Sequence, residues 1–258
     1  MVALAREAGN AILTIYSRSD RNAVVDWKAD RTPLTEADRA SHEVIVAGLR
    51  ALDPHTPIVS EESDRPVGSE LASGAPHWMV DPLDGTKEFL KGTGEFTVNI
   101  ALIGDGRPLA GVVHAPVLGR TWIGGMDGAE RREGNRRERL RVRRIRPDRL
   151  GVVASRDHAG PRVKELLERL PGAETVSMGS SLKFCVIAEG KADFYLRDGP
   201  TMEWDTAAAQ AVLEAAGGGV FTLDGEPLRY TKPDFRNPHF VAVGHLSWNW
   251  RELLRGEG

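Results

Sequence analysis

Two stretches near the beginning of the chain space their apolar residues as amphipathic helices do. Residues 3–16, ALAREAGNAILTIY, and the segment ASHEVIVAGLRALD that begins at Ala40 both repeat apolar positions at intervals of three and four. Pro54 follows the second segment and lacks the backbone N–H that a continuing helix would need. The pattern therefore predicts two helices, one on either side of the stretch VVDWKADRTPLTEAD.

The next apolar runs are short, and two of them end in acidic residues. TPIVSEES (56–63) and HWMVDPLDG (77–85) have the length of strands, and we expect them to be neighbours with their acidic ends at one edge of a sheet. Residues 96–125 contain three further apolar runs joined by Gly/Pro turns. This part of the chain is predicted to pack its helices on an antiparallel or mixed sheet.

The pattern changes after Arg146. LGVVASR is typical of a strand, GPRVKELLERL of a helix, and FCVIAEGKADFYL of a helix that leads into a strand. TAAAQAVLEAAGGG has the small residues of a closely packed helix and the glycines that stop one. Alternating strands and helices predict a layered α/β half. We therefore divide the chain into an N-terminal α+β half, 1–146, and a C-terminal α/β half, 147–258.

Composition is that of an ordinary globular protein. Of the 258 residues, 41% are hydrophobic and 28% are charged, and the formal net charge of -3 argues against a general nucleic-acid binder. Cys185 is the only cysteine, which excludes an intramolecular disulfide and favours a reducing cytoplasm. No apolar stretch approaches the roughly 20 residues of a membrane span. We expect a cytoplasmic enzyme with no nucleic-acid partner and no integral membrane segment; the sequence leaves its oligomeric state open.

One segment between the halves is rich in arginine. Residues 130–149, ERREGNRRERLRVRRIRPDR, contain ten arginines and four acids. The segment is either a phosphate or nucleic-acid patch or a solvated hairpin whose charges protect a sheet edge. Leu140, Val142 and Ile145 suggest an amphipathic strand, so we favour the hairpin.

The stretch DPLDGTKEF, residues 81–89, places two carboxylates where an apolar run ends. Like charges brought together in a partly dry site repel and raise each other's pKa, so a cation is needed to offset them. Mg²⁺ takes hard oxygen ligands and often bridges carboxylates and substrate phosphates. Pro82 and Gly85 permit a turn in which Asp81 and Asp84 converge. The alternative is an Asp-rich turn that only caps a helix beginning near Thr86.

Spacing separates this motif from that of the haloacid-dehalogenase-type phosphatases. Those enzymes carry Asp-x-Asp-Gly-Thr, with one residue between the acids, whereas Asp81 and Asp84 are separated by two. A mechanism through a phospho-aspartate is therefore not expected.

Three other acidic positions accompany the motif. SEES places Glu61 at a strand end, with Glu62 expected on the opposite side of an extended chain. Asp205 precedes the small-residue helix, where on its own it would be an ordinary N-cap. Thr35 and Asp38 have the spacing of a capping box.

Together, these elements resemble the inositol monophosphatase superfamily of magnesium-dependent, lithium-sensitive phosphatases. The matching segments are KADRTPLTEAD, VSEES, DPLDGTKEF and WDTAAAQAVLEAAGG, which run in the family's order from residue 28 to 219. The resemblance implies an α/β fold in which α+β elements form a five-layered αβαβα sandwich. It also implies a Mg²⁺ cofactor, with two or three ions per site.

The resemblance also implies roles for individual residues. The metal ligands would be the carboxylates of Glu61, Asp81, Asp84 and Asp205 with the backbone carbonyl of Leu83. Asp38 and Thr86 would orient and deprotonate the attacking water, and the N–H groups after Gly85 would contact the phosphate. Lys28, Asp30 and Thr35 would either help to place a third metal or only order the loop.

The segment MGSSLKFCVIAEGKADFYLRDGPTMEWD (178–205) resembles one branch of the family, which contains bacterial CysQ-type 3′(2′),5′-bisphosphate nucleotidases. Lys183 and Arg197 stand where the inositol branch has an uncharged and an acidic residue. A second phosphate that the metals do not neutralise needs such cations. We therefore expect Ser180, Lys183 and Arg197, with His158, to hold the nucleotide. The alternatives are a Lys183 that reaches bulk water and a surface Arg197.

The sequence thus predicts a phosphatase that removes the 3′-phosphate of adenosine 3′,5′-bisphosphate, a small-molecule nucleotide, and gives AMP and phosphate. The resemblance adds 3′-phosphoadenylyl sulfate as a second substrate to test, which would place the enzyme in sulfur metabolism. Two alternatives stay open: a phosphatase of inositol or other polyol phosphates, and a protein that senses the nucleotide without turnover.

Overall fold

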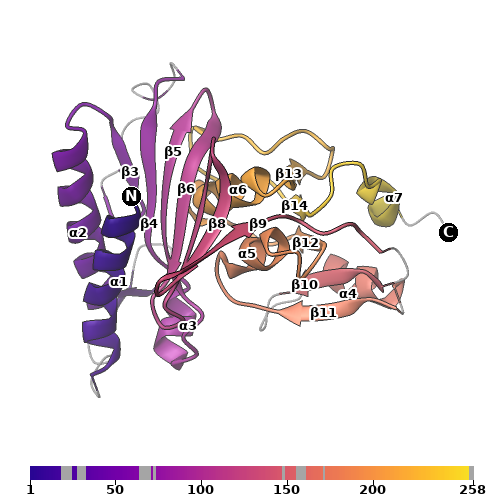
Figure 1. The fold of residues 1–258 in the computed structure, drawn as a ribbon, viewed down its shortest axis with the longest axis horizontal. Helices are drawn as coiled ribbons and strands as arrows, with labels where there is room; N and C mark the ends of the chain where they lie inside the picture. The colour runs from indigo at the N-terminus through magenta and orange to yellow at the C-terminus, as the bar shows by residue number, and fades with distance from the viewer. Residues whose placement is uncertain are drawn as a thin grey trace.

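Helices and sheets alternate across the molecule in five layers, in the order helix, sheet, helix, sheet, helix (Figure 1). The structure is a computed structural model that describes residues 1–18, 25–27, 33–63, 71, 74–146, 149–154, 161–170 and 172–255. This arrangement confirms the expected αβαβα sandwich. The boundary at residue 146 stays a prediction, although the first sheet uses strands before residue 141 and the second uses strands after residue 150.

The first sheet has seven strands in the order β3-β4-β5-β6-β7-β8-β9. Their bounds are β3 Ile58–Ser60, β4 His77–Asp84, β5 Thr97–Gly104, β6 Arg107–Ala115, β7 Arg120–Gly125, β8 Gly128–Glu133 and β9 Arg136–Leu140. β3 runs parallel to β4, and all other neighbours are antiparallel. The predicted mixed sheet is confirmed, including the three strands expected between residues 96 and 125.

Two long helices form the first layer, α1 (Val2–Tyr16) and α2 (Glu36–Leu52), and they pack on β4, β5 and β6. α2 begins four residues earlier than its apolar pattern suggests, because Thr35 caps it and forms a capping box with Asp38. A short hairpin of β1 (Val25–Trp27) and β2 (Pro33–Thr35) leads into this cap.

The middle layer consists of α5 (Leu182–Ala188) and α6 (Ala207–Ala215), both almost fully buried. α6 lies directly on the first sheet because its small residues face two glycines. A Cβ atom on Gly111 would lie 2.3 Å from the Ala208 carbonyl oxygen, and one on Gly124 would lie 2.4 Å from the Ala211 carbonyl oxygen. The small-residue pattern of α6 thus serves close packing, which fixes the beginning of this helix relative to the sheet.

The second sheet has the order β11-β10-β12-β14-β13. Its strands are β10 Gly151–Ala154, β11 Glu174–Ser177, β12 Phe194–Arg197, β13 Gly219–Thr222 and β14 Phe240–Val243. α4 (Pro161–Glu168) and α7 (Trp250–Arg255) cover its outer face as the fifth layer. Two further elements of the described chain are the helix α3 (Thr86–Lys91) and the 3₁₀ turn η2 (Glu203–Asp205).

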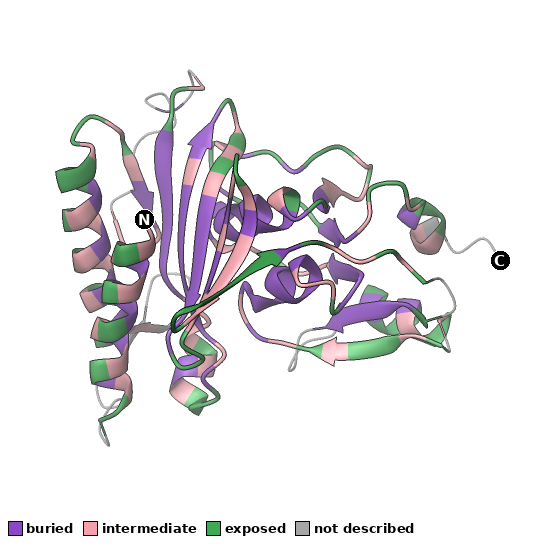
Figure 2. Cartoon of the chain, in the orientation of Figure 1, coloured by how far each residue is buried: buried purple, intermediate pink, exposed green. Residues whose placement is uncertain are grey.

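Buried side chains concentrate in the strands of both sheets and in the middle helices (Figure 2). Three apolar clusters result: one between the first helices and the first sheet, one around α5 and α6, and one beneath α4 and α7. Within the described ranges, no helix is long and apolar enough to cross a membrane.

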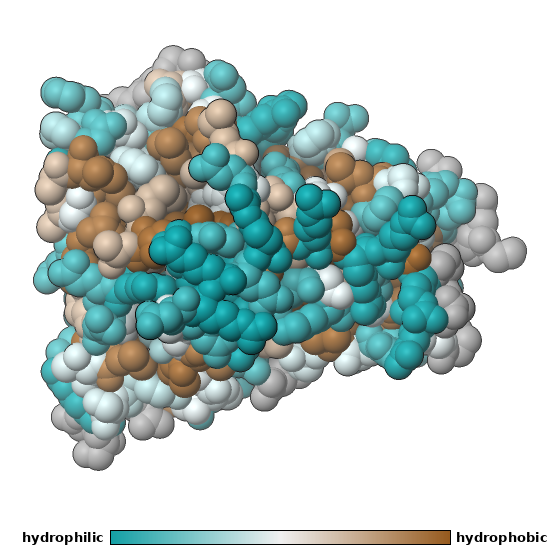
Figure 3. All heavy atoms as spheres, in the orientation of Figure 1, coloured by the Kyte–Doolittle hydropathy of each residue, from teal (hydrophilic) through white to brown (hydrophobic). Residues whose placement is uncertain are grey.

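The first part of the arginine-rich segment, up to Leu140, belongs to the β8–β9 hairpin at the edge of the first sheet, as favoured from the sequence, whereas Val142 and Ile145, expected in an amphipathic strand, lie outside the strands. Several of its arginines pair with acids: Arg131 with Glu138 and Glu189, and Arg132 with Glu130. Hydrophilic side chains gather along this edge and over the segment that follows it (Figure 3). These pairs agree with the hairpin interpretation, since exposed charge discourages further strand pairing.

Candidate active site

The DPLDGT motif lies where β4 ends. Asp81 pairs with Asn99 of β5 and Asp84 pairs with Thr97, and the register shifts between them, so the motif contains an irregularity of the kind a bulge produces. Pro82 sits at this irregularity, where its missing N–H costs no ladder bond. Gly85 follows with a left-handed backbone, φ 98° and ψ 44°, and α3 begins directly after it. The expected turn is therefore present.

Burial and mutual repulsion dominate the chemistry of this turn. Asp81 is 1% exposed. Burial raises the pKa of Asp81 well above its ordinary value, and the neighbouring charges of Glu61 and Asp84 add to the shift. Burial also raises the pKa of Asp205 to about 8, again with Asp84 and Glu61 contributing. The structure thus brings the four predicted acids within electrostatic reach of one another.

Each of these carboxylates has a defined orientation. Asp81 Oδ1 accepts a hydrogen bond of 3.1 Å from the N–H of Leu83. Asp205 Oδ2 accepts one of 2.8 Å from the N–H of Met202. Asp84 Oδ2 accepts two bonds of 2.7 Å, from the N–H and the hydroxyl of Ser181. The protein therefore holds one oxygen of each group and leaves the other for a ligand.

Asp38 lies beside the acidic cluster at the beginning of α2. It is 2% exposed and accepts hydrogen bonds from the N–H and hydroxyl of Thr35. Burial raises its pKa to about 6 despite these bonds, and the charges of Glu62 and Glu61 raise it further. In the part of the chain that the structure describes, Asp38 bonds Thr35 and not Thr86, so the joint role of Asp38 and Thr86 stays a prediction.

The donor set suits a hard divalent cation. All the predicted side-chain ligands are carboxylates, the oxygen ligands that Mg²⁺ prefers, and burial together with neighbouring acids raises the pKa of Asp81 and of Asp205. Among the described residues, no three His, Cys, Asp or Glu side chains stand close enough to enclose a metal as they are. Carboxylates that repel one another are expected to converge only around a cation.

A cavity of about 680 Å³ opens next to the carboxylates. Its lining includes Asp84, Gly85, Lys87, Glu88, Ser180, Lys183, Phe184, Tyr195, Arg197, Asp198, Gly199, Pro200, Thr201, Asp205, Thr206 and Phe240. Three of the four substrate-binding residues expected from the second half, Ser180, Lys183 and Arg197, therefore share one cavity with two of the expected metal ligands. The fourth, His158, lies outside the described residues, as do Lys28 and Asp30.

Lys183 is buried rather than extended into solvent. It is 7% exposed, its ammonium donates a hydrogen bond of 2.6 Å to the Ser180 carbonyl, and it lies 5.7 Å from the centre of the Tyr195 ring. Burial lowers the pKa of Lys183, and Arg197 lowers it further. The alternative in which Lys183 reaches bulk water is wrong. Lys183 and Arg197 therefore bring two positive charges to the cavity that Asp84 and Asp205 also line.

Arg197 ends β12 and is held by backbone carbonyls. Its guanidinium donates hydrogen bonds to the carbonyls of Gly199, at 3.2 Å, and Pro200, at 2.9 Å. Within the described contacts it has no acidic partner in an ion pair. Its charge is therefore presented to the cavity.

The sequence interpretation missed several residues behind the carboxylates. Ser181, Asn99 and Thr97 form a buried polar group that contacts Asp84. The signal for Asn99 was present, since it interrupts the apolar run TVNIAL with an amide that needs buried partners. Ser181 has no comparable signal because its side-chain partners Asn99 and Asp84 are more than 80 residues away in the chain.

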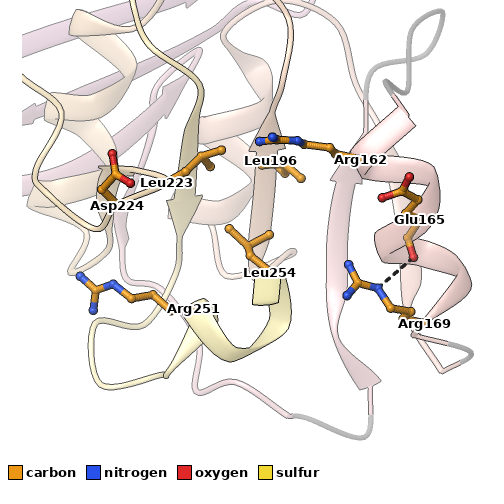
Figure 4. A pocket seen from close by; sticks show the side chains of 8 residues that line it. All are labelled: Arg162, Glu165, Arg169, Leu196, Leu223, Asp224, Arg251 and Leu254. Atoms are coloured by element: carbon orange, nitrogen blue, oxygen red, sulfur yellow. Dashed lines mark hydrogen bonds between the residues drawn. The ribbon is translucent and has the colours of Figure 1, made fainter. Parts of the chain in front are cut away.

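A second cavity, of about 520 Å³, lies on the outer face of the second sheet (Figure 4). Arg162 of α4 extends over Leu196 of β12, and Arg169 donates to the Glu165 carbonyl at 3.3 Å. Its charged residues are exposed and its floor is leucine. It has none of the buried carboxylates that distinguish the cavity beside Asp84.

Comparison with known proteins agrees with the fold and the motifs. A sequence model of the inositol monophosphatase family matches residues 1–254. The chain belongs to this family. It is 49% identical over 239 residues to the 3′(2′),5′-bisphosphate nucleotidase CysQ of Escherichia coli K12, which covers 92% of this chain and 95% of that protein. The CysQ of Buchnera aphidicola is 42% identical over 244 residues, which cover 93% and 90%.

Solved structures of the family are also similar. CysQ from Bacteroides thetaiotaomicron has a TM-score of 0.82 and 40% identity, with 94% of this chain and 95% of that chain covered. An IMPase of Thermotoga maritima has a TM-score of 0.79 at 24% identity, which supports the fold alone.

Proposed function

We propose that the chain is a magnesium-dependent 3′(2′),5′-bisphosphate nucleotidase that removes the 3′-phosphate of adenosine 3′,5′-bisphosphate and gives AMP and phosphate. The observation that carries this proposal is the shared cavity, whose lining brings the carboxylates of Asp84 and Asp205 together with the cations of Lys183 and Arg197. The relatives named as 3′(2′),5′-bisphosphate nucleotidases support it. 3′-Phosphoadenylyl sulfate is a further proposed substrate.

The cluster of carboxylates would hold the Mg²⁺ cofactor. Its proposed ligands are Glu61, Asp81, Asp84, Asp205 and the Leu83 carbonyl, with two or three Mg²⁺ ions per site. When bound, Mg²⁺ offsets the charge of the carboxylates and of the substrate phosphate. The N–H groups at Gly85 and Thr86 would contact the same phosphate at the beginning of α3.

Asp38 is the proposed base for the attacking water, and Thr86 would orient that water. A carboxylate whose pKa is raised to about 6 suits this role, because a general base works best with a pKa near the working pH. Asp38 also keeps an oxygen, Oδ1, that the Thr35 contacts do not use. Phosphoryl transfer otherwise needs positioning and charge stabilisation, which the carboxylate cluster and the cations Lys183 and Arg197 would supply.

The cations of the cavity, Lys183 and Arg197, would select the substrate. The 5′-phosphate of the nucleotide would lie against Lys183, Arg197 and Ser180, with His158 also proposed to contact it. A polyol monophosphate such as inositol 1-phosphate has no second phosphate to meet these cations, so nothing in it would offset the cost of desolvating them. Cys185, the single cysteine, is buried with its pKa raised by burial, and we propose a cytoplasmic setting for the enzyme.

The direct test is phosphate release from adenosine 3′,5′-bisphosphate and from inositol 1-phosphate, measured in parallel with millimolar Mg²⁺ and with EDTA. Strong, Mg²⁺-dependent preference for the nucleotide is expected. Preference for inositol 1-phosphate would favour the polyol alternative. Nucleotide binding by the native protein without release of phosphate would favour a sensor. The reference for this comparison is Asp84→Asn, which is expected to bind the nucleotide without turnover.

A further inference from the structure

Ser181 lies between a carboxylate of the first half and a turn of the second. Its N–H donates to Asp84 Oδ2 at 2.7 Å, and its hydroxyl lies 2.7 Å from both Asp84 Oδ2 and the Asp205 carbonyl oxygen, two acceptors that share its one proton. Asp84 ends β4 of the first sheet, whereas Asp205 ends the η2 turn that leads into α6. A single side chain therefore touches both residues.

A polar group behind Ser181 fixes the direction of its hydroxyl. Asn99 Nδ2 donates to Ser181 Oγ at 2.9 Å, and the Thr97 hydroxyl donates to Asn99 Oδ1 at 3.0 Å. The carboxylate of Asp84, which can only accept, lies 3.4 Å from Nδ2 and sets which end of the Asn99 amide is the donor. With one lone pair of the hydroxyl occupied, its proton can point only towards Asp84 or the Asp205 carbonyl.

These polar groups all converge on one oxygen of Asp84. The N–H and hydroxyl of Ser181 lie 2.7 Å from Oδ2 and Asn99 Nδ2 lies 3.4 Å from it, while the Thr97 hydroxyl, whose proton is directed to Asn99, lies 3.5 Å away. Among the described contacts, Oδ1 receives none. Asp84 is thereby held so that a single oxygen faces the cavity.

Ser181 itself is 1% exposed and is not part of the cavity lining, whereas its neighbour Ser180 is. Substrate therefore does not touch it. Side chains that orient metal ligands from behind commonly change metal affinity by about 10- to 100-fold.

We infer that Ser181 is a positioning residue, whose hydroxyl holds Asp84 as a one-oxygen ligand and couples it to the turn that carries Asp205. The inference rests on the proposed function, because it assigns Asp84 and Asp205 to a cation site. It deepens that function by naming the contact that joins the ligands of the two halves.

The test is the binding of Mn²⁺ without substrate, followed by the electron paramagnetic resonance signal of the free ion. Ser181→Ala is expected to raise the Mn²⁺ dissociation constant by about 10- to 100-fold. At saturating metal its KM for adenosine 3′,5′-bisphosphate is expected to stay within about twofold of native. Ser181→Thr, which keeps the hydroxyl, is expected to recover most of the lost affinity.

A matched control separates positioning from the loss of any buried hydroxyl. Thr121 is fully buried, its hydroxyl lies 3.0 Å from His114 Nδ1, and it stands three strands away from β4. Thr121→Val is expected to lower stability without changing Mn²⁺ affinity. If Ser181→Ala does not fold, Asn99→Ala removes the donor to the same hydroxyl, and a smaller rise in the dissociation constant is expected.

Native Mn²⁺ affinity in Ser181→Ala, or in Asn99→Ala where that variant replaces it, overturns the positioning role. A native protein that binds no Mn²⁺ overturns the metal site and the proposed function together. A native protein that binds Mn²⁺ but releases phosphate from neither substrate overturns the proposed function alone, since the comparison of Mn²⁺ affinities needs no turnover.

Discussion

The ammonium of Lys183 donates a hydrogen bond of 2.6 Å to the backbone carbonyl of Ser180, although Ser180 holds an unfavourable left-handed backbone with φ 43°. A non-glycine residue in this region is strained, and such strain concentrates at functional sites. The contact keeps a buried cation at the wall of the cavity, with Ser180 beside it. Both residues are placed to meet an anionic group.

Lys183→Met should therefore weaken the nucleotide selectively. The methionine fills similar space, so the fold is retained, and loss of a charged hydrogen bond worth about 1.5–3 kcal/mol should raise KM for adenosine 3′,5′-bisphosphate by roughly 10- to 100-fold. KM for inositol 1-phosphate should change little. Lys191→Met, at an exposed position, is the control. An equal loss for both substrates would show that Lys183 does not read the second phosphate.

Asp205→Asn should stabilise the metal-free protein while it removes activity. The folded pKa of about 8 lies above the ordinary value of 3.8, so the ionised group costs stability progressively as pH rises between these values. In EDTA, the melting temperature of the variant should match that of native protein near pH 4 and exceed it near pH 8. Asp224→Asn, at an exposed position, should show no such trend. A difference that is constant with pH would contradict the assignment.

Gly124→Ala should destabilise the junction between α6 and the first sheet. Its Cβ would lie 2.4 Å from both the Ala211 carbonyl oxygen and the Val212 Cα, and backbone atoms cannot move aside as a side chain can. We expect a loss of about 3 kcal/mol or more, at the upper end for overpacking, in urea unfolding. Gly125→Ala is the matched control, since its nearest neighbour would be 3.6 Å away. Equal midpoints for the two variants would refute close packing at Gly124.

His114 should make the fold sensitive to mild acid. Burial lowers its pKa to about 4, and its ring faces the Arg120 carbonyl, Thr121 and Arg6. The unfolded chain binds a proton near pH 6.5 and the folded chain does not, so stability falls as pH drops from 6.5 towards 4, by on the order of 3 kcal/mol.

His114→Gln should remove this part of the acid sensitivity, measured as the free energy of unfolding between pH 4 and 7. His55→Gln, at an exposed position, provides the comparison. An unchanged pH profile in His114→Gln would show that the imidazole is not the group responsible.

The layers could be predicted from the sequence because each depends on local pattern. Apolar spacing located α1 and α4, and short apolar runs located β5, β6 and β7. The four-residue strands β11, β13 and β14 were missed, although β10 and β12 have the same length and were predicted.

The acidic residues of the proposed metal site could be predicted from the sequence for a different reason. A motif places Asp81, Asp84 and Asp205 by residue type, and the charge of Asp84 contributes to the raised pKa of both Asp81 and Asp205. The hydrogen bond between Ser181 and Asn99 was not predictable, because it depends on how residues 82 positions apart meet in space. The glycines beneath α6 were missed for the same reason.

Because the pKa values of Asp81 and Asp205 are raised, protons compete with any incoming cation for these carboxylates. Near neutral pH the empty cluster retains protons that a bound divalent ion must displace. The heat of Mg²⁺ binding should then depend on the ionisation enthalpy of the buffer that takes up those protons. Acidification of the surrounding solution is therefore expected to weaken metal binding at the proposed site.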